Sequence, residues 1–133
     1  FKLYIPNKFT MKEGKKGKVL SHKKEIDFLF DKGQSFIFFP MQIIWLVKES
    51  EKDMYKLLIS IPKKKIKLAT KRNLLKRRIK EAFRTNKKDL EAHLLNKKIK
   101  LHFAIVFQNQ KIIEYNIIEQ KIKLILNRLI EEI

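Results

Sequence analysis

The spacing of hydrophobic residues near the start of the chain predicts a short helix. Ile26, Leu29 and Phe30 fall on one helical face, and Ser21 precedes them as a residue type that often caps a helix. Gly33 follows at the position where glycine commonly ends a helix. We therefore expect a first helix over about residues 22–32.

Three later segments have the composition and alternation of β-strands. Residues 36–47 are rich in aromatic and β-branched side chains, and Pro40 within them indicates a bulge or an edge. Residues 55–61 alternate next and are expected to pair with 36–47 as a hairpin. Residues 101–107 are apolar at nearly every position, which predicts a strand covered on both faces.

Two longer segments return to a helical period. An apolar stripe predicts a helix over 70–95, and a second stripe predicts a C-terminal helix over 118–133. The first stripe consists of Leu75, Ile79, Ala82 and Phe83. The predicted order is α-β-β-α-β-α, an α+β two-layer sandwich. We expect one domain over 21–133, preceded by a basic N-terminal arm over 1–20.

The charge of the chain indicates what class of partner the fold binds. The 133 residues hold 32 Lys and Arg against 14 Asp and Glu, a net charge of +18, and the sequence pI is about 10.1. Residues 63–88 carry 13 of the cations against Glu81, and four of the five Arg lie between 72 and 84. Because guanidinium binds phosphate oxygens bidentately, this segment predicts a surface that binds nucleic acid.

Several functional classes are excluded or disfavoured. The chain has no Cys, so cysteine zinc sites and thiol catalysis are excluded, and three Gly residues cannot build a glycine-rich phosphate loop. Three His (His22, His93 and His102) lie far apart in sequence, and we interpret His102 as structural. We expect no catalytic residue, no metal site and no small-molecule cofactor. With no membrane span and no signal peptide in the sequence, we expect a cytoplasmic protein.

One segment carries a family signature. Lys64-Lys65 is followed by Ala69, Arg72-Asn73, Lys76-Arg77 and then Lys80-Glu81-Ala82-Phe83-Arg84. This spacing resembles the bacterial ribonuclease P protein component, in which a basic pair after a strand precedes an Arg-Asn helix. Residues 26–33 resemble the family's first helix and its terminal glycine. The resemblance covers about residues 9–108.

The resemblance implies a function and a set of site residues. It implies the protein subunit of a ribonucleoprotein endonuclease, a hydrolase that matures the 5′ end of precursor tRNA, with the catalytic centre and most Mg²⁺ in the RNA subunit. It also implies a left-handed βαβ crossover, as in the second domain of ribosomal protein S5. The RNA subunit is expected to contact Lys71, Arg72, Asn73, Lys76, Arg77, Lys80 and Arg84. The cleft for the 5′ leader of precursor tRNA is expected to contain Ile26, Phe30, Trp45, Lys64 and Lys65.

Two positions depart from the family pattern. Leu74 stands where the family commonly has a second Arg, and Arg78 or Lys71 is the candidate replacement. Ile26 stands where the first helix commonly has an aromatic residue. Trp45 can be a stacking platform or a core residue. The alternative function is a non-catalytic RNA-binding or ribosomal-type protein, whereas a DNA-binding regulator and a membrane-surface helix fit the pattern less well.

Overall fold

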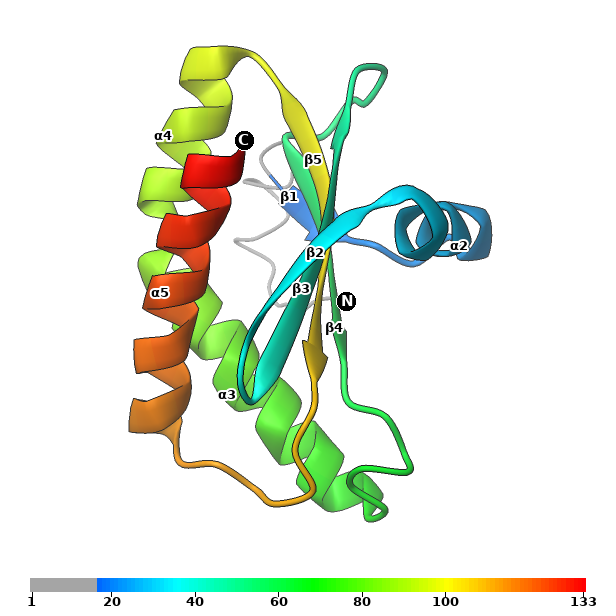
Figure 1. Ribbon diagram of the computed structural model, residues 1–133, viewed down its shortest axis with the longest axis vertical. Helices are drawn as coiled ribbons and strands as arrows, with labels where there is room; N and C mark the ends of the chain where they lie inside the picture. Colours follow the sequence, from blue (N-terminus) through cyan, green and yellow to red (C-terminus); the bar gives the residue numbers. More distant parts are fainter. Residues whose placement is uncertain (1–16) are drawn as a thin grey trace.

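The computed structural model describes residues 17–133, whose strands form one five-stranded sheet in the order β1-β4-β5-β3-β2. The strands are β1 (Gly17–Val19), β2 (Gln34–Phe38), β3 (Met41–Lys48), β4 (Tyr55–Ser60) and β5 (Lys100–Phe107). The helices are α2 (Lys23–Lys32), α3 (Ala69–Asn86), α4 (Lys88–Lys97) and α5 (Tyr115–Glu132). Figure 1 shows α3, α4 and α5 covering one face of the sheet, with α2 on the other.

The predicted α+β class is confirmed, and each face of the sheet has its own core. The larger core lies under α3, α4 and α5, and it includes the buried aromatic rings of Tyr55, Phe83 and Phe103, which meet at centroid distances of 5.6–6.1 Å. A smaller core lies under α2 and contains Leu29 from the helix with Ile44 and Ala104 from the sheet. Because α2 is one short helix, it covers only part of its face.

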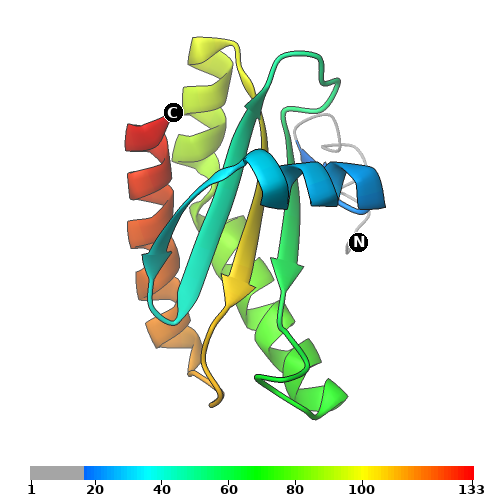
Figure 2. The ribbon, with the colours of Figure 1, turned by 45° about the vertical axis from the view of Figure 1, so that its right-hand side comes forward.

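The crossover between β4 and β5 has the hand that the resemblance implies. These strands are parallel neighbours, and α3 and α4 connect them. In Figure 2 both strands point downward, the connecting helices lie behind the sheet, and β5 lies to the left of β4. This arrangement is left-handed, whereas almost all such connections are right-handed. The similarity to ribosomal protein S5 stays a prediction.

The prediction of one strand over 36–47 is wrong. The segment forms a hairpin instead, in which β2 and β3 are antiparallel and Phe38 pairs with Met41. The two strands are joined by Phe39 and Pro40, whose peptide bond is cis. Pro40 cannot donate a hydrogen bond to a sheet, so it interrupts the strand rather than sitting within it.

The predicted hairpin between the strands at 36–47 and 55–61 is also wrong. β5 lies between β3 and β4, antiparallel to β3 and parallel to β4. β5 is buried from Leu101 to Phe107, as predicted for a strand covered on both faces. A strand apolar on both sides takes the centre of the sheet, and it displaces the pairing of strands that are neighbours in sequence.

The predicted helix over 70–95 is two helices that meet at Lys87. At the end of α3, Thr85 Oγ1 and Asn86 Nδ2 donate to the backbone oxygen of Ala82, at 3.2 and 2.8 Å. Side chains that satisfy carbonyls in this way replace the bonds of a continuing helix. The C-terminal helix is confirmed as α5, which begins at Tyr115.

The boundary of the predicted N-terminal arm is corrected at its end. Residues 1–16 lie outside the described residues, but Gly17–Val19 form β1, parallel to β4, and Leu20 is fully buried. The first helix is confirmed as α2, with His22 rather than Ser21 as its N-cap. Gly33 ends it as predicted, although with an extended backbone; a Cβ there would lie 2.5 Å from the carbonyl oxygen of Leu29.

No helix within residues 17–133 is both long enough and apolar enough to cross a bilayer.

Candidate nucleic-acid interface

The helix α3 presents its predicted basic residues outward. Its apolar stripe of Leu75, Ile79, Ala82 and Phe83 is buried against the sheet and α5, as predicted. The predicted contact residues at the surface are Lys71, Asn73, Lys76, Arg77 and Arg84, whereas Arg72 and Lys80 are half-buried. α3 therefore presents cations along the side that does not pack against the sheet or α5.

Arg72 has a structural role that the sequence did not reveal. Its Nη1 donates to the backbone oxygens of Ile66 at 2.9 Å and Lys67 at 2.7 Å. These bonds hold the Lys-rich loop that follows β4 against the first turn of α3. Lys64 is exposed and Lys65 is half-buried in this loop. Arg72 thus fixes where the loop's lysines lie. The two bonds use only its Nη1, so the N–H groups of Nε and Nη2 take no part in them.

Two other arginines are also engaged within the fold. Nη1 of Arg78 donates to the backbone oxygen of Ile113 at 2.7 Å, which ties α3 to the loop before α5. Arg78 is half-buried and engaged in this bond, whereas Lys71, the other candidate replacement for the family's second Arg at the position of Leu74, is exposed. Arg84 pairs with Glu81 through two bonds of 3.0 and 2.7 Å, and this hydrogen bonding holds the pKa of Glu81 below its usual value.

A cleft runs beside α2 on the open face of the sheet. Leu29 points into the smaller core, while Ile26 is half-buried and Phe30 is 46% exposed. On the other flank of α2, Glu25 contacts Lys56 and Phe28 contacts Lys48. Because residues of one helix are 100° apart, Ile26 and Phe30 project to the opposite side.

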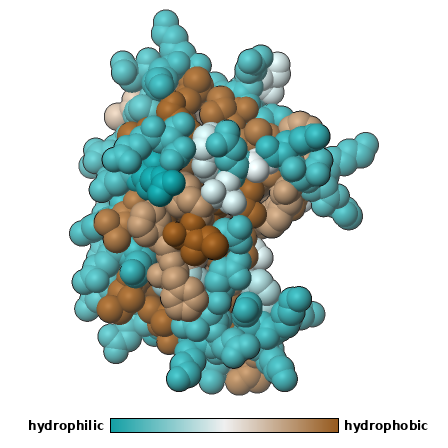
Figure 3. All heavy atoms as spheres, viewed as in Figure 1, coloured by the Kyte–Doolittle hydropathy of each residue, from teal (hydrophilic) through white to brown (hydrophobic). Residues whose placement is uncertain are grey.

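That side of α2 looks toward the end of the sheet where β4 leads into the Lys-rich loop. Ser60 ends β4 there, and Lys64 and Lys65 follow before α3 begins. Figure 3 shows the surface hollowed between α2, at the upper right, and the region where α3 begins, at the lower right. The structure therefore brings the predicted cleft residues Ile26, Phe30, Lys64 and Lys65 to one end of the open face.

Trp45 is a correction to the predicted cleft. Its side chain is 6% exposed and belongs to the larger core, on the face covered by α3, α4 and α5. Side chains alternate along β3, so Ile44 rather than Trp45 faces α2. Trp45 is a core residue and offers no surface for stacking.

Other exposed apolar residues were missed by the sequence interpretation. Phe28, Ile37 and Phe39 are 47%, 63% and 59% exposed. The Phe39 side chain lies at the β2–β3 turn, and Phe28 lies on α2 away from the cleft. Phe28 could have been noticed because it falls outside the apolar face formed by Ile26, Leu29 and Phe30.

A group of charged residues joins α2 to the sheet. Lys56 Nζ lies 3.2 Å from Oε1 of Glu25 and 3.5 Å from Oε2 of Glu51. Nε2 of the buried His102 lies 2.5 Å from Oε2 of Glu51. His102 is thus structural, as interpreted from the sequence, and its partner Glu51 comes from the loop between β3 and β4.

The same group has the composition of a metal site. Glu25, Glu51 and His102 each offer a ligand atom, and these atoms lie within 4.8 Å of one another. The ammonium group of Lys56 already supplies a positive charge between the two carboxylates, so a divalent cation there would be repelled. We interpret the group as an ion-pair network that fixes α2, and the absence of a metal site stays a prediction.

We expect Glu51 to make stability depend on acid pH. Burial acts to raise its pKa, but hydrogen bonds from His102 and from the backbone of Asp53 and Lys52, with the charge of Lys56, lower the pKa to about 2. Because the folded-state pKa lies below the ordinary value of 4.5, the stabilisation is complete above pH 4.5 and is lost as pH falls toward 2. It amounts to up to about 3 kcal/mol.

The measurement is urea unfolding of the wild type and of Glu51→Gln between pH 7 and pH 2. The difference between the two free energies of unfolding should shrink as the pH falls. Glu49→Gln, an exposed carboxylate in the same loop, is the control. A difference for Glu51→Gln that stays constant over this range would contradict the role of its charge.

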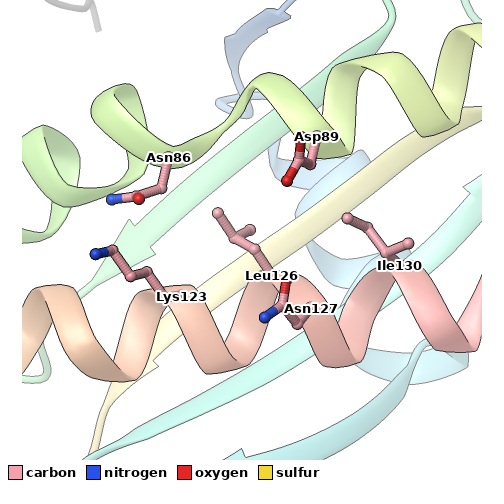
Figure 4. Close-up of a pocket in the computed structure, with 6 residues that line it drawn as sticks. All are labelled: Asn86, Asp89, Lys123, Leu126, Asn127 and Ile130. Carbon is pink, nitrogen blue, oxygen red and sulfur yellow. The ribbon is translucent and has the colours of Figure 1, made fainter.

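A shallow pocket lies on the helical side of the molecule, between α5 and the α3–α4 junction. Its lining residues are Asn86, Asp89, Lys123, Leu126, Asn127 and Ile130 (Figure 4). The lining combines amide and apolar groups with one acid and one base, on the face of the sheet that α2 does not occupy. It is not part of the basic surface or of the cleft.

Comparison with known proteins identifies the family. The sequence model of the family described as Ribonuclease P matches residues 15–130. The chain belongs to the ribonuclease P protein family. The ribonuclease P protein component of Porphyromonas gingivalis, in each of two strains, is 27% identical over 99 residues, which cover 74% of this chain and 72% of that protein.

Solved structures of ribonuclease P proteins share the fold. A mutant protein from Staphylococcus aureus matches with a TM-score of 0.70 and 20% identity, covering 91% of this chain and 93% of the other. The protein from Thermotoga maritima matches with a TM-score of 0.61 and 19% identity, covering 84% and 96%. Membership in the ribonuclease P protein family makes the chain a protein subunit of an endoribonuclease of tRNA processing, with ribonuclease P RNA as its partner.

Proposed function

We propose that α3 and the preceding Lys-rich loop bind the ribonuclease P RNA, and that the cleft beside α2 binds the 5′ leader of precursor tRNA. One observation carries the proposal. The Lys-rich loop with Lys64 and Lys65 joins the end of β4 to the first turn of α3, and it lies at the end of the open sheet face toward which Ile26 and Phe30 of α2 project. A single protein surface can then contact two RNA molecules at their junction.

The residue types suit these two RNA ligands. Lys71, Lys76 and Arg77 can neutralise phosphates on a folded RNA, which releases counterions and makes binding depend on salt. Asn73 is exposed between them and can hydrogen-bond a backbone or a base edge. In the cleft, Phe30 can stack on an unpaired base, an interaction worth ~1–3 kcal/mol.

We place the hydrolytic step in the RNA subunit and the complex in the cytoplasm. Mg²⁺, held mainly by the RNA, supplies Lewis-acid chemistry at the scissile phosphate when it is bound. The residues of this chain contribute by holding the leader and by offsetting phosphate repulsion with fixed positive charges. Less Mg²⁺ is then needed for the same degree of RNA neutralisation.

Reconstitution tests this proposal. The purified chain alone should not cleave precursor tRNA, whereas with its cognate RNA it should lower the Mg²⁺ concentration required for cleavage. The measurement is the initial rate of 5′ maturation across a Mg²⁺ titration, with and without the protein. Cleavage by the protein alone, or an unchanged Mg²⁺ titration, would contradict the proposal.

A further inference from the structure

The flank of α2 away from the cleft also carries an exposed aromatic residue. Phe28 is 47% exposed, and Nζ of Lys48 lies 4.9 Å from the centre of its ring. Phe28 and Phe30 therefore project from opposite sides of the same short helix. An aromatic ring left at the surface beside a cation is a common element of surfaces that bind single-stranded nucleic acid.

Lys48 has a second lysine directly across the sheet. Lys48 on β3 and Lys100 on β5 are register partners, so both side chains lie on the face that carries α2. Like charges directly opposite each other destabilise a sheet. Among residues 17–133, no carboxylate lies within ion-pair distance of either lysine. The pair is a place where an external anion would be stabilising.

The neighbouring row of the sheet shows that the fold can neutralise such charges. Lys56 lies on the same face and is paired with both Glu25 and Glu51. These two carboxylates are held by Lys56 and His102 and are not directed to Lys48 or Lys100. The positive charge beside Phe28 is therefore localised, and it is adjacent to a network that keeps α2 in a fixed position.

We propose that Phe28, Lys48 and Lys100 form a second binding site for single-stranded RNA, separate from the cleft. The exposed part of the Phe28 ring stacks on an unpaired base, and the two ammonium groups bind the adjoining phosphates. RNA is the occupant because its phosphates complement the lysine pair and its bases complement the ring. The choice of RNA as the ligand rests on the proposed function, whereas the position of the site does not depend on where the leader binds.

The direct test is binding of a fluorescent oligouridine of about 10 nucleotides, long enough for an aromatic and cationic surface. Phe28→Ala should weaken binding roughly 5-fold or more, since a stack is worth ~1–3 kcal/mol. Lys48→Ala/Lys100→Ala should lower the slope of log affinity against log salt by about 1.4, the value for two phosphates of a single strand. Phe39→Ala, at the other end of β3, is the matched aromatic control.

A double variant separates the new site from the cleft. If one oligouridine strand contacts both the cleft and the new site, the fold-losses of Phe28→Ala and Phe30→Ala should multiply in Phe28→Ala/Phe30→Ala. Thermal unfolding checks that each variant is folded. Unchanged oligouridine affinity and salt slope in both Phe28→Ala and Lys48→Ala/Lys100→Ala would overturn the proposal.

The reconstituted complex tells which RNA occupies the site. If the strand is the leader, Lys48→Ala/Lys100→Ala should raise KM for a long-leader precursor and leave a short-leader one unchanged. If the strand belongs to the RNA subunit, the variant should weaken subunit association for both substrates. Normal reconstitution by the wild type with no effect of the variant on either quantity would remove this site and leave the proposed function standing.

Discussion

Replacing Lys76 and Arg77 together with Ala is expected to weaken binding to the ribonuclease P RNA roughly 50-fold at ~0.1 M salt. Both side chains are exposed on α3, and neither takes part in an ion pair within residues 17–133. With the value of about 0.9 per phosphate contact that holds for duplex DNA, losing two contacts should reduce the salt slope by nearly 2. The measurement is affinity for the RNA subunit across a salt series.

The control for this variant removes the same charge elsewhere. Lys121→Ala/Lys123→Ala lowers the net charge equally, but these lysines lie on α5. If α3 is the interface, the control should change affinity by only a few fold. Equal losses in both variants would show that net charge, and not the α3 surface, determines the affinity.

Replacing Arg72 should affect RNA binding in a different way from replacing Lys76. Its guanidinium holds the backbone oxygens of Ile66 and Lys67, so its removal frees the loop that carries Lys64 and Lys65.

The stripe of α3 and its exposed cations were predictable because both follow from local helical spacing. The hydrogen bonds of Arg72 and Arg78 could not be predicted from the sequence. Their acceptors are the backbone oxygens of Ile66, Lys67 and Ile113, and a pattern of side chains does not indicate which backbone oxygens will accept.

The wrong predictions of strand 36–47 and of its pairing with 55–61 have a related cause. Alternation along a strand shows which residues share a face, but not which face is covered by which helix. β3 is apolar on both sides, with Ile44 toward α2 and Ile43 and Trp45 toward the larger core. Pairing of β5 between β3 and β4 joins segments distant in sequence, so the order of the strands could not be obtained from neighbouring patterns.

Trp45→Ala is expected to destabilise the fold by about 3–5 kcal/mol, the usual cost of emptying an aromatic core position. The side chain is 6% exposed and packs in the larger core under α3, α4 and α5. Urea unfolding gives the free energy directly. Trp45→Phe keeps most of the apolar volume and should cost far less. Similar stabilities for Trp45→Ala and the wild type would contradict the placement of this side chain.

The folded variant Trp45→Phe separates a core role from a role in the cleft. It should bind the leader of precursor tRNA as the wild type does, whereas Phe30→Ala should weaken leader binding by ~1–3 kcal/mol. Trp45 is also the single Trp of the chain, so its fluorescence reports on one known place. A leader oligonucleotide should leave that fluorescence nearly unchanged, since the β-sheet lies between the indole and the face that carries α2. Strong quenching by the leader would mean that the indole stacks on RNA, and that the cleft includes the residue the structure assigns to the core.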